Sequence, residues 1–363
     1  NNTWTNGDKQ YIPGTTSIVD ANTTIDWNIV ETSHNVTMDN SSLPAGNENN
    51  RSVLALLIED NELTVEGDNA SETGNGITVT HYLALGVGNS NVKLDLEGES
   101  QLIQTEGSDL DVASAGTIER DQQGTADTYI YNYWSSPVGV SNTTTNNNSY
   151  TLPNIMRDGT QSINWLTSGY NGTNANPIGI ADYWVWKYVN QLSDNYPSWQ
   201  HVRSTGTLNV GEGFTMKGPG TGLPTDNQNY VFEGKPNNGD ITLTLSPGND
   251  YLVGNPYASA IDANEFILDN ISDNGGRAAS NIIDGTVYFW EHFANATHNL
   301  AEYEGGYATY SLMGSTLAIS NHILINQSGV VGTKTPGRYI PVSQGFFVIA
   351  DNGGSISFKN SQR

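Results

Sequence analysis

The chain reads YWSSPV at residues 133–138, YWVW at 183–186, GEGF at 211–214 and YVF at 230–232. The same order of blocks returns as LVGNPY at 252–257, VYFW at 287–290, SQGF at 343–346 and ISF at 356–358. Short runs rich in aromatic and β-branched residues, separated by Gly and Pro, are typical of β-strands, and their ordered recurrence indicates a duplicated unit. The sequence therefore predicts two equivalent β-sandwich-like domains, copy 1 at residues 128–246 and copy 2 at residues 247–363. In this match of the blocks, Trp186 corresponds to Trp290 and Phe214 to Phe346.

The aromatic residues of these blocks are the predicted core of the two copies. Side chains alternate between the faces of a strand, so Trp184, Trp186 and Tyr188 share one face, and Tyr288 and Trp290 share the matching face of copy 2. Large apolar rings at duplicated positions are more often core than ligand platforms. The predicted core residues are Trp134, Trp184, Trp186, Phe214, Trp290 and Phe346.

Two further aromatic residues fall in a turn-like segment around Pro197 rather than in a strand pattern. Aromatic faces can stack on sugar rings, and loops carry binding residues more often than core strands do. Tyr196 and Trp199 are therefore the candidates for ligand binding.

The segment upstream of the duplication has its own pattern. Between residues 51 and 118, alternating apolar runs such as Leu63–Val65 and Val92–Leu96 recur about every dozen residues and are split by Gly, Asn and Asp turns. The pattern favours the rungs of a short parallel β-helix over residues 1–125, with a plain antiparallel sandwich as the alternative. We thus predict an all-β chain, with one helix candidate at 261–267 that Asp262 would cap.

The composition narrows the class of function. The chain has 38 acidic and 14 basic residues, a net charge of −24, which opposes binding to nucleic acid or to anionic membranes. No run approaches the roughly 20 apolar residues of a membrane helix, so no membrane insertion is expected. The absence of Cys excludes disulfides and thiolate chemistry and favours a bacterial over a eukaryotic extracellular protein.

No catalytic signature is present, and the sequence predicts a protein that is not an enzyme. It contains no nucleophile elbow, phosphate-binding loop or paired-His zinc motif. Alternate acids on turns can hold Ca²⁺ through oxygen ligands, which makes Asp109, Asp111 and Asp273 the calcium candidates. The simpler interpretation of the segments around residues 109–111 and 273 is a solvated acidic loop. Ca²⁺ is the single cofactor that the sequence suggests.

The blocks at 133–138, 211–218 (GEGFTMKG), 252–257, 305–308 (GGYA) and 340–348 (IPVSQGFFV) occur in an order that resembles a known group. They are similar to the C-terminal-region β modules of large surface proteins of Bacteroidetes, especially Flavobacteria, which leave the cell by type IX secretion. The resemblance covers about residues 100–363. It implies a secreted or cell-surface protein with an adhesive or structural role and supplies no catalytic residues.

Two functions are compatible with these features. The first is an extracellular structural protein that assembles with itself into a filament or surface layer, since a repeated unit and sheet edges offer contacts to a neighbouring copy. The second is a glycan-binding cell-surface adhesin module. The first predicts polymers in purified material, and the second predicts a monomer with saturable sugar binding.

Overall fold

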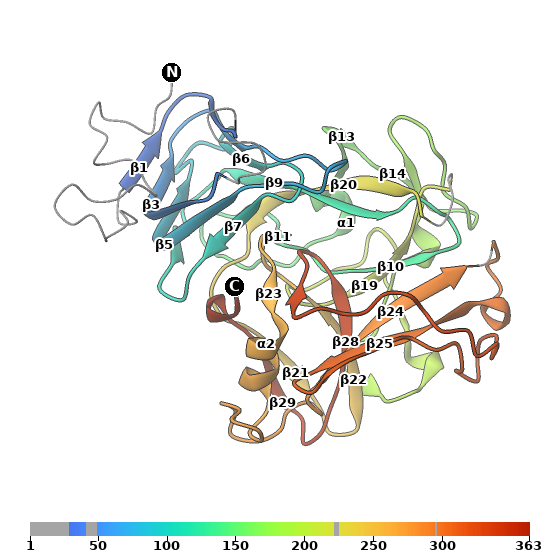
Figure 1. Cartoon of the computed structure of the whole chain (residues 1–363). Helices are drawn as coiled ribbons and strands as arrows, with labels where there is room; N and C mark the ends of the chain where they lie inside the picture. The colour runs from blue at the N-terminus through green and yellow to red at the C-terminus, as the bar shows by residue number, and fades with distance from the viewer. Residues whose placement is uncertain (1–28, 41–48, 221–224, 295) are drawn as a thin grey trace.

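The computed structural model describes residues 29–40, 49–220, 225–294 and 296–363. Of the predicted first domain, residues 1–28 and 41–48 lie outside the described part. The structure is almost all β, with 44% of residues in strands and 7% in helices, which confirms the all-β prediction. Figure 1 shows an N-terminal solenoid in blue, copy 1 in green and yellow, and copy 2 in orange and red.

The N-terminal region is a β-solenoid of about three turns, as the alternating runs predicted. Its two parallel sheets contain β1 (Ile29–Thr32), β3 (Arg51–Ile58), β5 (Gly76–Leu85), β7 (Gln101–Gln104) and β8 (Asp109–Leu110) on one side, and β2 (Val36–Met38), β4 (Glu62–Val65), β6 (Lys93–Leu96) and β9 (Thr117–Thr125) on the other. Leu63, Leu94 and Ile118 are in register from coil to coil and fully buried. These stacked apolar side chains fill the interior of the solenoid.

Strand β9 belongs to the solenoid and to copy 1 at once. It runs parallel to β6 on one edge and antiparallel to β20 (Asn227–Pro236) on the other, where Ile118 lies opposite Gly234 and Thr125 opposite Asn227. The same sheet continues into copy 1 through β11 (Val138–Gly139), β12 (Met156–Asp158) and β13 (Gln161–Ser162). Strand β9 therefore joins the solenoid and copy 1 in one continuous sheet.

Each copy has a sheet with the same strand order. In copy 1 the order is β10 (Tyr131–Trp134), β19 (Phe214–Lys217), β16 (Trp186–Lys187) and β18 (Gln200–His201). In copy 2 it is β22 (Asn249–Gly254), β28 (Gly345–Ile349), β24 (Thr286–Ala294) and β25 (Glu304–Ser311), extended by β17 (Gln191–Leu192) and β26 (Gly314–Thr316). A second layer is formed by β9 and β20 in copy 1 and by β21 (Ile241–Leu245) and β29 (Gly354–Phe358) in copy 2.

The pairing registers show which residues correspond. Trp134 lies opposite Phe214, and Val253 lies opposite Phe346, so the two fully buried Phe residues are equivalent, as predicted. Trp186 pairs with Thr215, the residue after Phe214, whereas Tyr288 pairs with Phe347. The counterpart of Trp186 is thus Tyr288, and the predicted match with Trp290 is two residues out of register.

Helices are short and lie in the connections. Helix α1 (Leu152–Ile155) and helix α2 (Ala263–Asn270) occupy equivalent places in the two copies. The side chain of Asp262 accepts the backbone N–H of Asn264 at 2.9 Å, which confirms the predicted N-cap of α2. The remaining strands form two small pairs, β14 (Asn164–Leu166) with β15 (Gly179–Ala181) and β23 (Ile261–Asp262) with β27 (Tyr339–Ile340).

The backbones of the two copies contact each other at a junction, and the contacts there are repeated as if by a two-fold axis. Trp134 forms a β-bridge with Gln344, and the equivalent residue Val253 forms one with Glu212. The Ser135 N–H donates to the Ser343 carbonyl at 2.7 Å, and at the equivalent position the Gly254 N–H donates to the Gly211 carbonyl at 3.1 Å. An isologous interface repeats each contact in this way. This junction brings one face of each sheet toward the other copy (Figure 1).

A candidate ligand-binding groove between the copies

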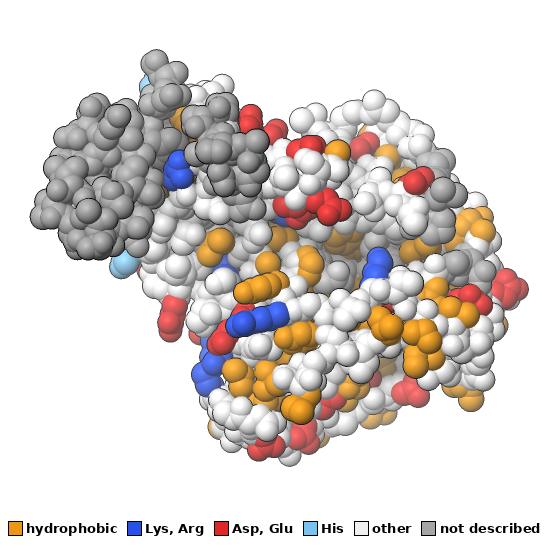
Figure 2. Space-filling view, in the orientation of Figure 1, with side chains coloured by type: hydrophobic (Ala, Val, Ile, Leu, Met, Phe, Trp, Pro, Cys, Tyr) orange, Lys and Arg blue, Asp and Glu red, His pale blue; other side chains and the backbone are white. Residues whose placement is uncertain are grey.

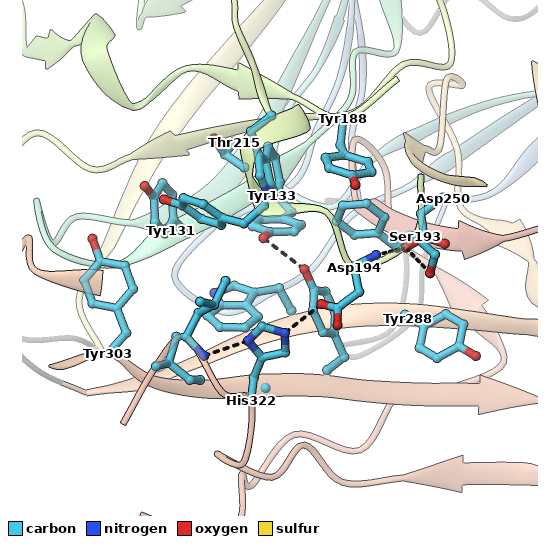
Figure 3. A pocket seen from close by; sticks show the side chains of 18 of the residues that line it. Tyr131, Tyr133, Tyr188, Ser193, Asp194, Thr215, Asp250, Tyr288, Tyr303 and His322 are labelled. Carbon is cyan, nitrogen blue, oxygen red and sulfur yellow. Dashed lines mark hydrogen bonds and ion pairs between the residues drawn. The ribbon is translucent and has the colours of Figure 1, made fainter. Parts of the chain in front are cut away.

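A cavity of about 740 Å³ lies where the two sheets face each other, and we call it the aromatic groove. Its walls come from β10, β16 and β19 of copy 1 and from β24, β25 and β28 of copy 2, together with loops at 193–199 and 317–325. Figure 3 shows side chains of the two copies on opposite sides of the space. The aromatic lining residues are Tyr131, Tyr133, Trp186, Tyr188, Tyr196, Trp199, Tyr288, Trp290, Tyr303, Tyr307 and Phe347.

Alternation along the strands produces this lining. Trp186 and Tyr188, like Tyr288 and Trp290, are two residues apart and therefore point to one face of their sheet. Trp134, Trp184, Phe214 and Phe346 are buried, as predicted for core residues. The core prediction is wrong for Trp186 and Trp290, which are half-buried in the groove wall, because their face meets the other copy rather than the second layer of its own copy.

The rings of the groove are held by their neighbours. Tyr133 stacks on Trp290 across the junction, with ring centroids 6.2 Å apart and planes 15° apart, and its hydroxyl lies 3.3 Å from that of Tyr307. Trp186 stacks on His201 at 4.0 Å. Rings fixed by such contacts lose little freedom when a ligand binds.

The structure brings both predicted ligand-binding candidates into this groove. Trp199 packs edge-on against Tyr188 at 5.3 Å and against Phe347 at 5.8 Å. Tyr196 begins a short 3-10 turn (Tyr196–Ser198) at the rim and is 51% exposed. Their roles in binding stay a prediction, and nine further aromatic residues line the same cavity.

One end of the groove is acidic. Asp250 accepts the Ser193 hydroxyl at 3.0 Å, while its other oxygen, Oδ1, is buried with no hydrogen-bond partner among the described residues. Asp194 accepts the Nε2 of His322 at 2.8 Å across the groove. Burial, with smaller contributions from Asp194 and Asp284, raises the pKa of Asp250. Figure 3 shows Ser193, Asp194 and Asp250 together on one side of the view.

Behind the opposite end of the groove, against the rings of Tyr131 and Tyr303, lies a buried cation that is not part of the groove lining. The Nζ of Lys217 lies 3.9 Å from the ring centroid of Trp184 and 4.4 Å from that of Tyr131, and donates to the Tyr303 hydroxyl at 2.7 Å. Burial lowers the pKa of Lys217 to about 7. Such a cage of rings favours the ammonium form, against the cost of burying a charge.

Two histidines accompany Lys217. The His298 Nδ1 lies 3.2 Å from the Lys217 Nζ, and burial lowers the pKa of His298 to about 4. Neither ring nitrogen of His292 has a hydrogen-bond partner among the described residues, and burial lowers its pKa to about 3. This end of the groove therefore resists taking up further protons.

The calcium candidates are not brought together. Asp109 is exposed on the solenoid, and Asp111 accepts the hydroxyl of Tyr82 and the N–H of Ala113. Asp273 accepts an amide of Asn281 in copy 2 at 2.7 Å. Within the described ranges, no group of three or more His, Asp or Glu residues could hold a metal ion. The interactions of Asp111 and Asp273 are those of ordinary acidic turns.

Sequence reasoning missed the polar ends of the groove. Asp194, Asp250, His322 and Lys217 come from separate loops and strands, and no short motif joins them. A single signal existed for Lys217, which follows the GEGF block at a buried strand position where a charge is unusual. In the part of the chain that the structure describes, none of the helices is long and apolar enough to cross a membrane.

The fold and groove define a class of protein in which a parallel β-solenoid leads into two fused, duplicated β units with a shared aromatic groove. The chain belongs to the family described as a domain of unknown function, DUF8693, whose family model matches residues 20–363. That match includes every residue that the structure describes. No curated protein and no solved structure shows significant similarity to the chain.

Proposed function

We propose that the chain is a glycan-binding module of a bacterial surface or secreted protein, and that the aromatic groove is its binding site. The observation that carries the proposal is the groove lining, in which eleven aromatic side chains surround a few polar groups within one cavity of about 740 Å³. Ligand sites typically have volumes of about 300–1,000 Å³ and this mixture of apolar walls and sparse polar groups. Type IX secretion is consistent with this role and is part of the proposal.

The chemistry of sugars suits this surface. The C–H face of a pyranose ring packs on the flat face of Trp or Tyr, while its hydroxyls need hydrogen-bond partners at the edges. Asn195, Thr309 and Asn321 line the groove and offer amide or hydroxyl groups of that kind. An extended oligosaccharide could thus lie between the two sheets with its rings against copy 1 or copy 2.

Binding of neutral oligosaccharides, measured by calorimetry, tests the proposal. Tyr196→Ala removes a half-exposed rim ring and should weaken binding by about tenfold, equivalent to about 1.4 kcal/mol. The matched control is Tyr339→Ala, which removes a Tyr outside the groove that is 64% exposed, against 51% for Tyr196. Absence of saturable binding to every glycan tested would refute the proposal. Release of shorter sugars would show hydrolysis in place of binding.

Self-assembly into a filament or surface layer is the second candidate, and one observation favours it. Copy 2 exposes several apolar side chains between residues 313 and 339, with Met313 96%, Ile323 79% and Tyr339 64% exposed. Figure 2 shows apolar side chains over the lower half of the view, where copy 2 lies in Figure 1. Large exposed apolar areas are typical of contact surfaces. A protein that stays monodisperse and monomeric in light scattering at high concentration, with and without millimolar Ca²⁺, would exclude this candidate.

A further inference from the structure

The charges around the aromatic groove define which glycans it can accept. Among the described residues that line it, two are acids, Asp194 and Asp250, one is His322, and none is Lys or Arg. We infer that the groove selects glycans bearing ammonium groups, that is amino sugars such as glucosamine, and that Asp250 and Asp194 receive the ammonium. This inference rests on the proposed glycan binding and assigns the substrate class of the same site.

Asp250 is the stronger of the two acceptors. Its Oδ2 is occupied by the Ser193 hydroxyl, while Oδ1 has no donor among the described residues. Because Oδ1 is shielded from solvent and Asp250 is half-buried in the groove wall, the charge of this carboxylate is poorly solvated, and a cationic group beside it is favoured. An ammonium group offers three donors and a charge, whereas a sugar hydroxyl offers a single neutral donor.

Asp194 is the more exposed of the two acids, and it has a histidine partner. The Leu324 backbone N–H donates to Nδ1 of His322 at 3.3 Å, which directs the Nε2 of that ring toward Asp194 at 2.8 Å. The side chain of Asp194 is 76% exposed and is therefore open to an incoming ligand.

Aromatic rings beside the acids add to the attraction for a cation. Tyr188, Trp199 and Phe347 form a triangle of rings with centroids 5.3 to 5.8 Å apart, and all three line the groove with Asp250. Ring faces attract ammonium groups, and in this protein Lys217 already shows that preference at the other end of the groove. Acidic sugars such as uronates meet like charge at Asp250 and are disfavoured.

Calorimetry with matched tetrasaccharides over a range of pH tests the inference, since the sugar amine has to be protonated while the Asp250 carboxyl, whose pKa burial raises, has to be ionised. The ligands are glucosamine, N-acetylglucosamine, glucose and galacturonic acid tetramers, with tetralysine as a probe of charge alone. We expect the glucosamine tetramer to bind about tenfold more tightly than its acetylated form, and added salt to reduce that preference. Galacturonic acid tetramers should bind most weakly.

The variants separate this inference from the proposed function. Asp250→Asn should reduce the ratio of the affinities for the amine and the neutral tetramers to within about twofold. Asp109→Asn is the control, because it changes the net charge by the same amount on the solenoid and should leave the preference for the amine unchanged. If Asp250→Asn fails to fold, Asp194→Asn tests the same preference at the more exposed acid.

Three results would overturn the assignment. Equal affinity for the amine and the neutral tetramers refutes the amino-sugar inference and leaves the proposed function standing. Tetralysine binding as tightly as the glucosamine tetramer shows that charge alone is recognised. Lack of binding by every saccharide refutes both the inference and the proposed function.

Discussion

His292 makes the junction between the copies sensitive to acid. It lies on β24, packs on Tyr303 at a ring distance of 4.9 Å, and has no partner for either ring nitrogen among the described residues. Burial, together with the nearby Lys217, lowers its pKa to about 3. We expect His292→Phe, which keeps an aromatic ring without a titratable group, to reduce the loss of stability in acid.

The size of this effect follows from the difference between the pKa of His292 in the folded protein and its pKa in the unfolded chain. In the unfolded chain the imidazole is solvated and its pKa is about 6.5. Because the folded-state pKa is lower, the unfolded chain binds the proton more tightly, so this stability is complete above about pH 6.5 and is lost as the pH falls toward 3. Between about pH 7 and about pH 4 the linkage amounts to roughly 3 kcal/mol.

Urea denaturation followed by Trp fluorescence measures the free energy of unfolding across this range. The loss of unfolding free energy between neutral and acid pH should be smaller in His292→Phe than in the wild type by roughly 3 kcal/mol, a large part of a typical stability of about 5–15 kcal/mol. His81→Phe is the control, because it replaces an exposed His on the solenoid. If the larger Phe ring fits poorly, the free energy of unfolding would be lower by a similar amount at every pH. Its dependence on pH would still test the prediction.

The reasoning is refuted if His292→Phe loses stability in acid as steeply as the wild type. An equally reduced loss of stability in His81→Phe would also refute the reasoning, because removal of any histidine would then have the same effect. His298, whose pKa is lowered to about 4, acts in the same direction and keeps some acid sensitivity in the variant.

Further perturbations follow from the same junction. The pKa of Lys217 is lowered from 10.5 to about 7, so the folded protein binds this proton less tightly than the unfolded chain does. The free energy of unfolding should therefore rise between about pH 7 and about pH 9. Lys217→Met should flatten that rise, as measured by urea denaturation. A Cβ at Gly254 would lie 2.6 Å from the Ser135 Cβ, so Gly254→Ala should lower the free energy of unfolding by about 1–3 kcal/mol. Gly239→Ala is the comparison, because its Cβ would meet no close atom and the variant would report only the cost of a positive φ.

Local patterns in the sequence were enough for the strands and for part of the core. Alternating apolar runs predicted the solenoid, and the repeated blocks predicted equivalent positions for Phe214 and Phe346. The cap at Asp262 also follows from local chemistry, because a short acidic side chain satisfies the first free N–H groups of a helix.

The groove could not be predicted because it depends on long-range placement. Alternation shows that Trp186 and Trp290 each belong to one face of a strand, but it does not show whether that face meets a second layer or another copy. The two-residue error that matched Trp186 with Trp290 arose because the aromatic blocks of the two copies are offset relative to the pairing of their strands. Asp250 and Lys217 likewise approach the groove from strands far apart in the chain.

The duplication has a consequence for how a ligand can lie in the groove. Tyr131 pairs with Lys217 in copy 1, and the equivalent pair in copy 2 is Asp250 with Ile349. Two identical subunits joined by a two-fold axis would present the same groups at both ends and would accept a chain in either direction. In the fused chain the equivalent positions differ, so a caged amine lies behind one end of the groove and a carboxylate lies at the other. If the groove binds a glycan as proposed, a chain with a head and a tail would meet different groups in its two orientations, and one orientation would be preferred.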